Sequence, residues 1–223
     1  QKNGLVHVLS VLTLLAYNLI IKYFVSQEEG DLEFCDKVLN QQLALYPEGA
    51  WFLYLKGRLE LIQGNMQESS SWYIKSWKSQ NVWPQFHHIC FWELTWANCM
   101  MCDWKEADIY ASLLLKESKW SRTIYSYQKA SIMLMSPEED LTEEDRSAIT
   151  SLMLNLPKWK QRIAGKSLPM EKFAIKKAER YSNQNNHLVL PALELLYIWN
   201  YFKIIAKKTE LCDNIYRIVD KSF

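Results

Sequence analysis

The sequence predicts an all-α protein, an α-solenoid of stacked antiparallel helix hairpins. Three observations favour this class. The 223 residues include only 6 glycines and 6 prolines, too few for a turn-rich sheet protein. Hydrophobic residues make up 49% of the chain and aromatic residues 13%, so the chain can bury a sizeable core. Finally, residues 50–73 have an echo 38 residues further along the chain.

The repeat is clearest at small and turn residues. The shift superposes Gly57 on Thr95, Gly64 on Cys102, Asn65 on Asp103 and Ser69 on Ala107. Gly30 precedes Gly64 by 34 residues, and a period of 34–38 is typical of tetratricopeptide-like hairpins. We therefore interpret Gly57 and Ser69 as packing residues between antiparallel helices, and Gly64 with Asn65 as the turn that joins them.

The helices can be placed along the chain from this repeat and from local signals. They are expected near 4–26, 31–46, 50–64, 66–80, 84–102, 104–118, 121–135, 143–156, 169–183, 191–207 and 209–221. Thr142 with Asp145 resembles a capping box, and Pro169 and Pro191 suit first helical positions. We predict a single α-helical repeat domain over 1–223, with tetratricopeptide-like hairpins in 1–136 and a degenerate, irregular helical continuation in 137–223.

The first helix is strongly apolar. Residues 5–21 carry no formal charge, but a membrane span needs about twenty mainly apolar residues and this stretch is shorter. We interpret it as a buried helix that begins the solenoid. The alternative is a peripheral membrane or lipid-binding role for the apolar helix 4–26.

Four later segments together resemble one family. They are HHICFWELTW (87–96), SKWSRTIYSYQKA (118–130), GKSLPMEKFAIKKAERY (165–181) and LPALELLYIWNYF (190–202). Read in this order they closely resemble the tetratricopeptide-repeat-protein-39 family and its fungal inclusion-body-clearance relatives, from about residue 30 onward. The resemblance implies a non-enzymatic helical-repeat protein, cytoplasmic or membrane-associated, with links to lipid homeostasis, inclusion-body clearance and ciliary assembly.

Chemistry at a catalytic, cofactor or metal site is not expected. Gly57 and Gly64 are spaced one residue too far apart for a phosphate-binding loop, and the Lys-Ser/Thr pair is missing. Cys99 and Cys102 form a CxxC pair without a second pair of ligands, which disfavours zinc. Five cysteines fit a reducing compartment, and we expect a cytoplasmic location. We assign no catalytic residue, no cofactor and no metal, and predict that the protein is not an enzyme.

The predicted function is a scaffold or adaptor that binds an apolar peptide or helix of a protein partner. In stacked hairpins the first helix of each repeat lines a groove. The groove residues are Trp51, Tyr54, Arg58, Ile89, Trp92, Trp96 and Tyr127. They are largely aromatic, and aromatic anchors are typical hot spots. The alternative is that these rings pack against neighbouring helices.

A basic stretch at 158–180 is an alternative binding site, whose ligand would be an anionic lipid headgroup or an acidic peptide. Its eight basic residues are Lys158, Lys160, Arg162, Lys166, Lys172, Lys176, Lys177 and Arg180. Such runs are usually solvated faces, which we favour here. Membrane association is therefore the less favoured alternative, and with a net charge of +1 nucleic acid is not expected.

Two expectations concern the C-terminal region. Glu194 lies in a mostly apolar helix and should have a cationic partner, with Lys172 or Arg180 nearest in sequence. We also expect Trp199 and Phe202 to pack against helices 143–156 and 169–183. The last helix should then expose Ile215, Ile218 and Phe223. Self-association through this C-terminal edge is a further expectation, because the ends of a solenoid need polar caps.

Overall fold

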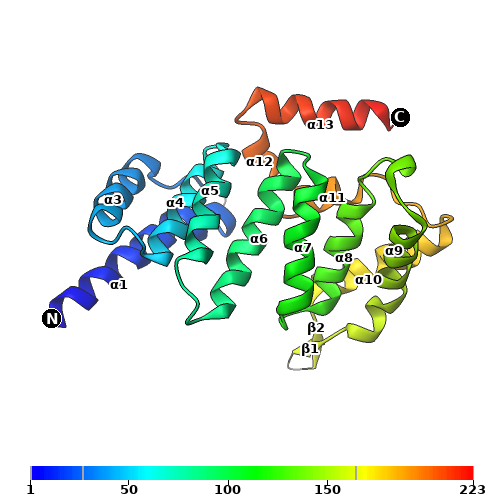
Figure 1. The fold of residues 1–223 in the computed structure, drawn as a ribbon, viewed down its shortest axis with the longest axis horizontal. Helices are drawn as coiled ribbons and strands as arrows, with labels where there is room; N and C mark the ends of the chain where they lie inside the picture. Colours follow the sequence, from blue (N-terminus) through cyan, green and yellow to red (C-terminus); the bar gives the residue numbers. More distant parts are fainter. Residues whose placement is uncertain (1, 27, 164, 223) are drawn as a thin grey trace. The chain divides into compact units, whose positions relative to one another are not determined.

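The structure is a computed structural model that describes residues 2–26, 28–163 and 165–222, and it confirms the all-α class (Figure 1). In chain order the elements are α1 (Lys2–Ala16), a π-helical turn (Tyr17–Ile21), α2 (Lys22–Phe24), α3 (Leu32–Leu45), α4 (Ala50–Ile62), α5 (Met66–Lys78), α6 (Pro84–Met100), α7 (Trp104–Glu117), α8 (Arg122–Met133), a 3₁₀ turn (Glu138–Asp140), α9 (Glu143–Asn155), a second 3₁₀ turn (Leu156–Trp159), β1 (Arg162–Ile163), β2 (Lys166–Ser167), α10 (Pro169–Asn183), α11 (Pro191–Ile198), α12 (Phe202–Ile205) and α13 (Thr209–Lys221). The sequence did not predict the short antiparallel pair of β1 and β2.

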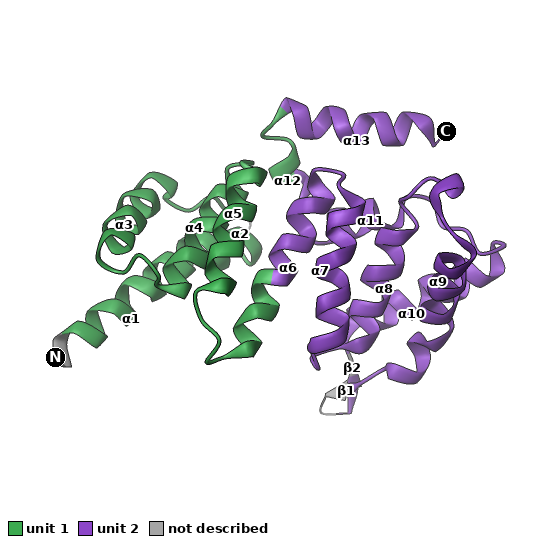
Figure 2. Ribbon diagram, viewed as in Figure 1, with its two compact units in different colours: residues 1–90, 203–208 green, residues 91–202, 209–223 purple. Residues whose placement is uncertain are grey.

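The chain forms two compact units (Figure 2). Unit 1 contains residues 1–90 and 203–208, and unit 2 contains residues 91–202 and 209–223. The boundary between the units falls within α6. The division after residue 136, which separates regular from irregular repeats, stays a prediction. The six residues 203–208 join a unit from which they are far removed in sequence.

The turns of the two best hairpins have the same geometry, as the repeat predicts. Gly64 between α4 and α5 has φ +85°, and Cys102 between α6 and α7 has φ +60°. In each turn the next amide donates back into the preceding helix, Asn65 N to Glu60 O at 2.9 Å and Asp103 N to Asn98 O at 3.0 Å. This bond satisfies a carbonyl that the helix end would leave unpaired.

The small residues of the first hairpin are packing residues, as expected. A Cβ on Gly57 would lie 2.9 Å from the ring of Tyr73, which is fully buried on α5. The Ser69 hydroxyl donates to the carbonyl of Gly57 at 2.8 Å. The close approach of α4 and α5 therefore depends on the missing side chain at Gly57.

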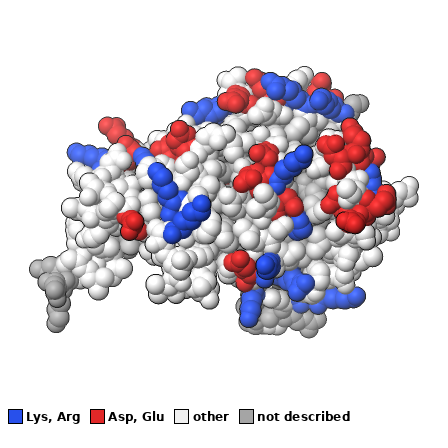
Figure 3. Space-filling model, viewed as in Figure 1, with Lys and Arg blue, Asp and Glu red and all other residues white. Residues whose placement is uncertain are grey.

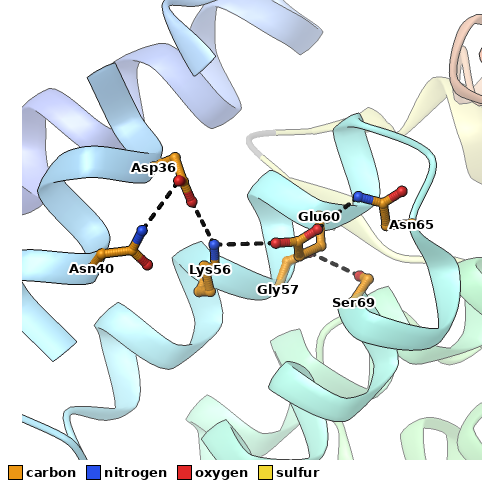
Figure 4. A network of polar contacts seen from close by, with 7 residues as sticks. All are labelled: Asp36, Asn40, Lys56, Gly57, Glu60, Asn65 and Ser69. Carbon is orange, nitrogen blue, oxygen red and sulfur yellow. Dashed lines mark hydrogen bonds and ion pairs between the residues drawn. The ribbon is translucent and has the colours of Figure 1, made fainter. Parts of the chain in front are cut away.

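A charged network ties α3 to the same hairpin (Figure 4). Lys56 is buried on α4, and its Nζ lies 2.5 Å from Asp36 Oδ1 of α3 and 3.1 Å from Glu60 Oε1. Burial lowers the pKa of Lys56, but the hydrogen bonds to Asp36 and Glu60 outweigh it and leave that pKa raised. The buried charge of Lys56 is therefore paired on both sides.

The expectation that the first helix is buried is wrong. Among the described residues, Gly4–Phe24 is the one helical segment long and apolar enough, at 21 residues, to cross a membrane by length and composition. Only 17% of its apolar window is buried. Leu15 and Leu19 face the core of unit 1, whereas Leu5 and Leu9 are 65% and 53% exposed. Burial fails because the rest of unit 1 covers only one face of the second half of this helix.

The expected single helix over 191–207 is also wrong. Asn200 adopts φ +62°, and the amide of Tyr201 donates to the carbonyl of Leu196 at 2.9 Å, so α11 ends and a short α12 begins afterwards. Asn tolerates the left-handed conformation better than most residues. The other local signals hold: Thr142 and Asp145 form the capping box of α9.

Pro169 and Pro191 each occupy the first helical position of their helices, α10 and α11. These two predictions are confirmed.

The C-terminal contacts differ from those expected. Trp199 packs on Trp92 of α6, with ring centroids 5.3 Å apart, and Phe202 lies beside Tyr197. Trp199 also lines a cavity with Met170 and Ala174 of α10, whereas packing of these two rings on α9 stays a prediction. Ile215 of α13 is buried rather than exposed and Ile218 is half-buried, because α13 turns its apolar side inward. Phe223 lies outside the described residues.

Candidate functional site

The predicted groove residues fall in both units, and most of them are buried or half-buried by other parts of the chain. In unit 1, Trp51 is 41% exposed, Ile89 is half-buried, and Tyr54 is buried. Arg58 is fully buried on α4; its Nε donates to the carbonyl of Leu19 at 3.3 Å. The helix that precedes α3 therefore covers the α4 face that we expected to be open.

Aromatic rings surround the guanidinium of Arg58. Its Cζ lies 4.2 Å from the ring centroid of Phe24 and 5.9 Å from that of Tyr23. Burial raises the pKa of Tyr23 to about 12, although the neighbouring Arg58 opposes the shift. Arg58 thus stabilises the contact of α2 with α4 through cation–π attraction.

In unit 2 the predicted groove residues are covered by α10 and by α11 with the residues that directly follow it. Trp96 and Tyr127 are buried; Trp96 lies beside Tyr201 and Tyr127 beside Phe173. The gap left between these helices is a cavity of about 10 Å³ lined by Trp92, Gln128 and Trp199 among others. That volume holds about one water molecule and no side chain of a partner.

Partner binding at Trp96 and Tyr127 therefore stays a prediction that requires α10 and α11 to move. The rings do pack against neighbouring helices in this structure, which is the alternative stated from the sequence. Of the predicted groove residues, Trp51 is the most exposed of those in unit 1.

The exposed aromatic surface of unit 1 is centred on Trp51. We call the surface formed by Trp51, Val82 and Trp83 the Trp51 patch; Val82 is 96% and Trp83 50% exposed. The Trp51 ring lies 6.2 Å from that of Trp83, and both rest on buried Phe86, at 4.8 and 6.2 Å. Two exposed indoles supported by a buried ring can bury a large apolar area when a partner binds. Little side-chain conformational entropy is lost on binding, because aromatic side chains have few rotatable bonds.

The loop that carries Val82 and Trp83 is held by one side chain. The Gln80 amide donates from Nε2 to the carbonyl of Trp83 at 3.0 Å and accepts from the Trp83 amide at 2.8 Å. His87 Nε2 lies 2.7 Å from the carbonyl of Gln80 and acts as the donor, since a carbonyl only accepts. These bonds hold the backbone of the loop that presents the two exposed side chains.

Val82 and Trp83 are not among the predicted groove residues. The predicted residues all occupy helix positions, whereas these two lie in the connection between α5 and α6. The available signal was NVWP (81–84), two large apolar residues in a short polar connection that ends at a helix-starting proline. An exposed aromatic residue in a loop is a stronger functional indication than one on a buried helix face.

The basic stretch contains both paired and exposed side chains, and its binding of an anionic ligand stays a prediction. Lys177 Nζ pairs with Glu194 Oε1 at 2.5 Å, so Glu194 has the expected cationic partner, but it is neither Lys172 nor Arg180. Arg180 donates to the side chain of Gln184 instead. Lys158, Lys160, Lys166, Lys172 and Lys176 are exposed, and the side chain of Arg162 lies outside the described residues.

The two cysteines of the CxxC pair are poorly reactive. Cys99 is fully buried and Cys102 half-buried at the end of α6. Burial raises the pKa of both thiols, that of Cys102 to about 11, so neither is a ready thiolate nucleophile or ligand. Within the described ranges no three His, Cys, Asp or Glu residues are grouped to hold a metal ion.

Comparisons with known proteins extend over nearly all of the chain. The model of the Iml2/Tetratricopeptide repeat protein 39 family matches residues 1–222. Tetratricopeptide repeat protein ttc-39B of Caenorhabditis elegans is 35% identical over 215 residues, which cover 96% of this chain and 36% of the relative. The chain thus spans about a third of the length of that curated relative. No solved structure gives a significant match.

Proposed function

Because this chain belongs to the Iml2/Tetratricopeptide repeat protein 39 family, we propose that it acts as a non-catalytic protein-interaction scaffold. Stacked helix hairpins of this kind bind partners through surfaces that several helices present together. The cytoplasmic location, and the links to lipid homeostasis and inclusion clearance, stay predictions from the resemblance.

The Trp51 patch carries the proposal. Its two indoles and Val82 expose apolar area beside one another, and Gln80 fixes the loop that presents them. Interface hot spots are enriched in Trp and are strongest where the residue is rigid before binding. We infer that the patch receives an apolar segment of a partner, anchored by large aliphatic or aromatic side chains.

A displayed library of random peptides tests the proposal, with the 223-residue chain as the target. Selected peptides should share large apolar anchor residues. Trp83→Ala should weaken their binding at least about tenfold, and Val82→Asp should do the same because it places a charge in the contact. Val82 is 96% exposed, so this substitution leaves the fold unaffected.

Matched controls lie in unit 2. Val189→Asp and Tyr216→Ala change residues that are 56% and 68% exposed, and both should retain the affinity of the selected peptides. Peptides that bind Val82→Asp and Trp83→Ala as tightly as the unaltered chain would contradict the role of the patch. Circular dichroism of each variant checks that the helices are intact.

A further inference from the structure

Two segments of unit 2 share an unusual sequence feature. Lys119-Trp120-Ser121-Arg122 leads into α8, and Lys158-Trp159-Lys160 follows α9. In each, basic residues flank a tryptophan. The segments are more than 30 residues apart in sequence, yet the guanidinium of Arg122 lies 4.5 Å from the ring centroid of Trp159.

A buried carboxylate holds these segments together. Glu171 of α10 is fully buried; its Oε1 accepts from the Ser121 hydroxyl at 2.7 Å and its Oε2 from the amide of Gln161 at 2.9 Å. Ser121 also caps α8 by accepting from the amide of Ile124 at 3.2 Å. The relative position of the two basic segments is therefore fixed by hydrogen bonds to a group that solvent does not reach.

The surface around this junction is cationic. Lys116, Lys119, Arg122, Lys158 and Lys160 are all exposed. On residues 116–122 and 158–161 they oppose a single acidic residue, Glu117. Basic side chains gather around the lower ends of α7 and α8 in the space-filling view (Figure 3).

The environment of the two tryptophans indicates which class of anionic partner fits this surface. Trp120 is 52% exposed, and Trp159 is half-buried beneath Arg122. One face of Trp159 is thus occupied and Trp120 leans on Tyr125 at 5.9 Å, so neither ring offers the free stacking platform that single-stranded nucleic acid needs. Tryptophan flanked by Lys and Arg instead suits the headgroup region of a bilayer, where the indole is interfacial and the cations meet phosphates.

We propose that this surface, which we call the KW surface (Lys119, Trp120, Arg122, Lys158 and Lys160), docks on anionic phospholipid membranes. The lysines and Arg122 bind lipid phosphates and carboxylates, and Trp120 enters the headgroup layer. The proposal is independent of the Trp51 patch, which lies in unit 1.

Vesicle sedimentation tests the proposal with the 223-residue chain. The chain should bind phosphatidylserine–phosphatidylcholine vesicles more tightly than pure phosphatidylcholine vesicles, and high salt should abolish the difference. One basic residue near an anionic surface strengthens binding about fivefold, so K119Q/K160Q should weaken binding to the anionic vesicles about 25-fold. Trp120→Ala should weaken binding without a change in charge.

The matched control is K75Q/K78Q on α5 of unit 1. Both lysines are exposed and lie over tryptophan rings, Lys75 over Trp72 at 4.5 Å and Lys78 over Trp77 at 5.5 Å. The change in net charge is identical, so the control should bind the anionic vesicles as the unaltered chain does. Thermal unfolding of all variants verifies that each is folded.

Three outcomes would overturn the proposal. Equal loss of binding in the control would show an effect of total charge rather than of the KW surface. Equal binding to neutral and anionic vesicles would assign adsorption to apolar residues elsewhere. Binding of soluble polyglutamate or RNA through Lys119 and Lys160, with no vesicle binding, would assign the surface to a different partner class.

Discussion

At the scale of single residues, the helix contacts are set by a few small side chains and polar atoms. Gly57 lets α4 approach α5, and the hydroxyl of Ser69 uses that approach to reach the carbonyl of Gly57. Glu171 has a corresponding role in unit 2, where its carboxylate accepts hydrogen bonds from two separate segments. Each of these residues determines which surfaces meet.

The role of Gly57 can be measured with a matched pair of glycines. Gly57→Ala should destabilise the chain by about 1–3 kcal/mol, because the new methyl group overlaps the immobile ring of Tyr73, even though alanine favours the helix. Gly4→Ala on α1 meets no atom within 4 Å and should leave stability unchanged or raise it by up to about 1 kcal/mol. Urea unfolding distinguishes them; equal effects would show that the contact with Tyr73 is unimportant.

At the scale of elements, α1 with its π-helical turn and α2 has two different faces. Leu15, Leu19 and Tyr23 are buried against unit 1, and the side chain of Asn18 accepts from the amide of Asp31 at 3.1 Å. On the other side Ser10 and Thr13 donate to carbonyls one turn back, at 2.8 Å each. The exposed apolar side therefore carries no unsatisfied hydroxyl donor at these two residues.

The two faces should respond differently to substitution. Leu19→Ala should cost about 2–5 kcal/mol, because it leaves a cavity in the core of unit 1. Leu9→Ala should change stability by less than about 0.5 kcal/mol, since Leu9 is 53% exposed. Chemical unfolding of the chain gives both values, and a large cost at Leu9 would mean that something covers this side in solution.

At the scale of the whole molecule, residues 203–208 connect distant parts of the chain within unit 1. Lys203 lies 5.3 Å from the ring centroid of Tyr23, and Lys207 pairs with Glu29. The bond to Lys207 is the main reason that the pKa of Glu29 lies below its ordinary value of 4.5. A carboxyl group whose pKa is lowered by folding stabilises the folded chain at every pH above its pKa in the unfolded state. This contribution is lost as the pH falls through the pKa of the folded state.

This connection predicts a long-range effect of substitution. Ile205 is buried, and Ile205→Ala should destabilise the chain by about 2–5 kcal/mol. Because 203–208 belongs to unit 1, amide hydrogen exchange should accelerate in α2 and α4, far earlier in sequence. Faster exchange confined to α11 and α13 would contradict the assignment of this segment to unit 1.

The sequence by itself determined the local structure of this protein. The repeat located the turns at Gly64 and Cys102, and the capping box and the two helix-starting prolines located α9, α10 and α11. These features depend on backbone conformation and on hydrogen bonds within a few residues, so they can be predicted from residues that are close together in the sequence. Even the end of α11 had a local signal, Asn200, that we did not use.

The tertiary structure alone decided which faces stay open. The aromatic positions of the predicted groove can pack on the chain's own helices as well as on a partner, because the hydrophobic effect is non-directional and does not depend on separation in sequence. Arg58 is covered by α2, Trp96 and Tyr127 by segments that follow them by many residues, and unit 1 recruits 203–208. Among the predicted anchors Trp51 kept a large exposed area beside other exposed apolar residues, since Val82 and Trp83 lie on the neighbouring loop and are 96% and 50% exposed.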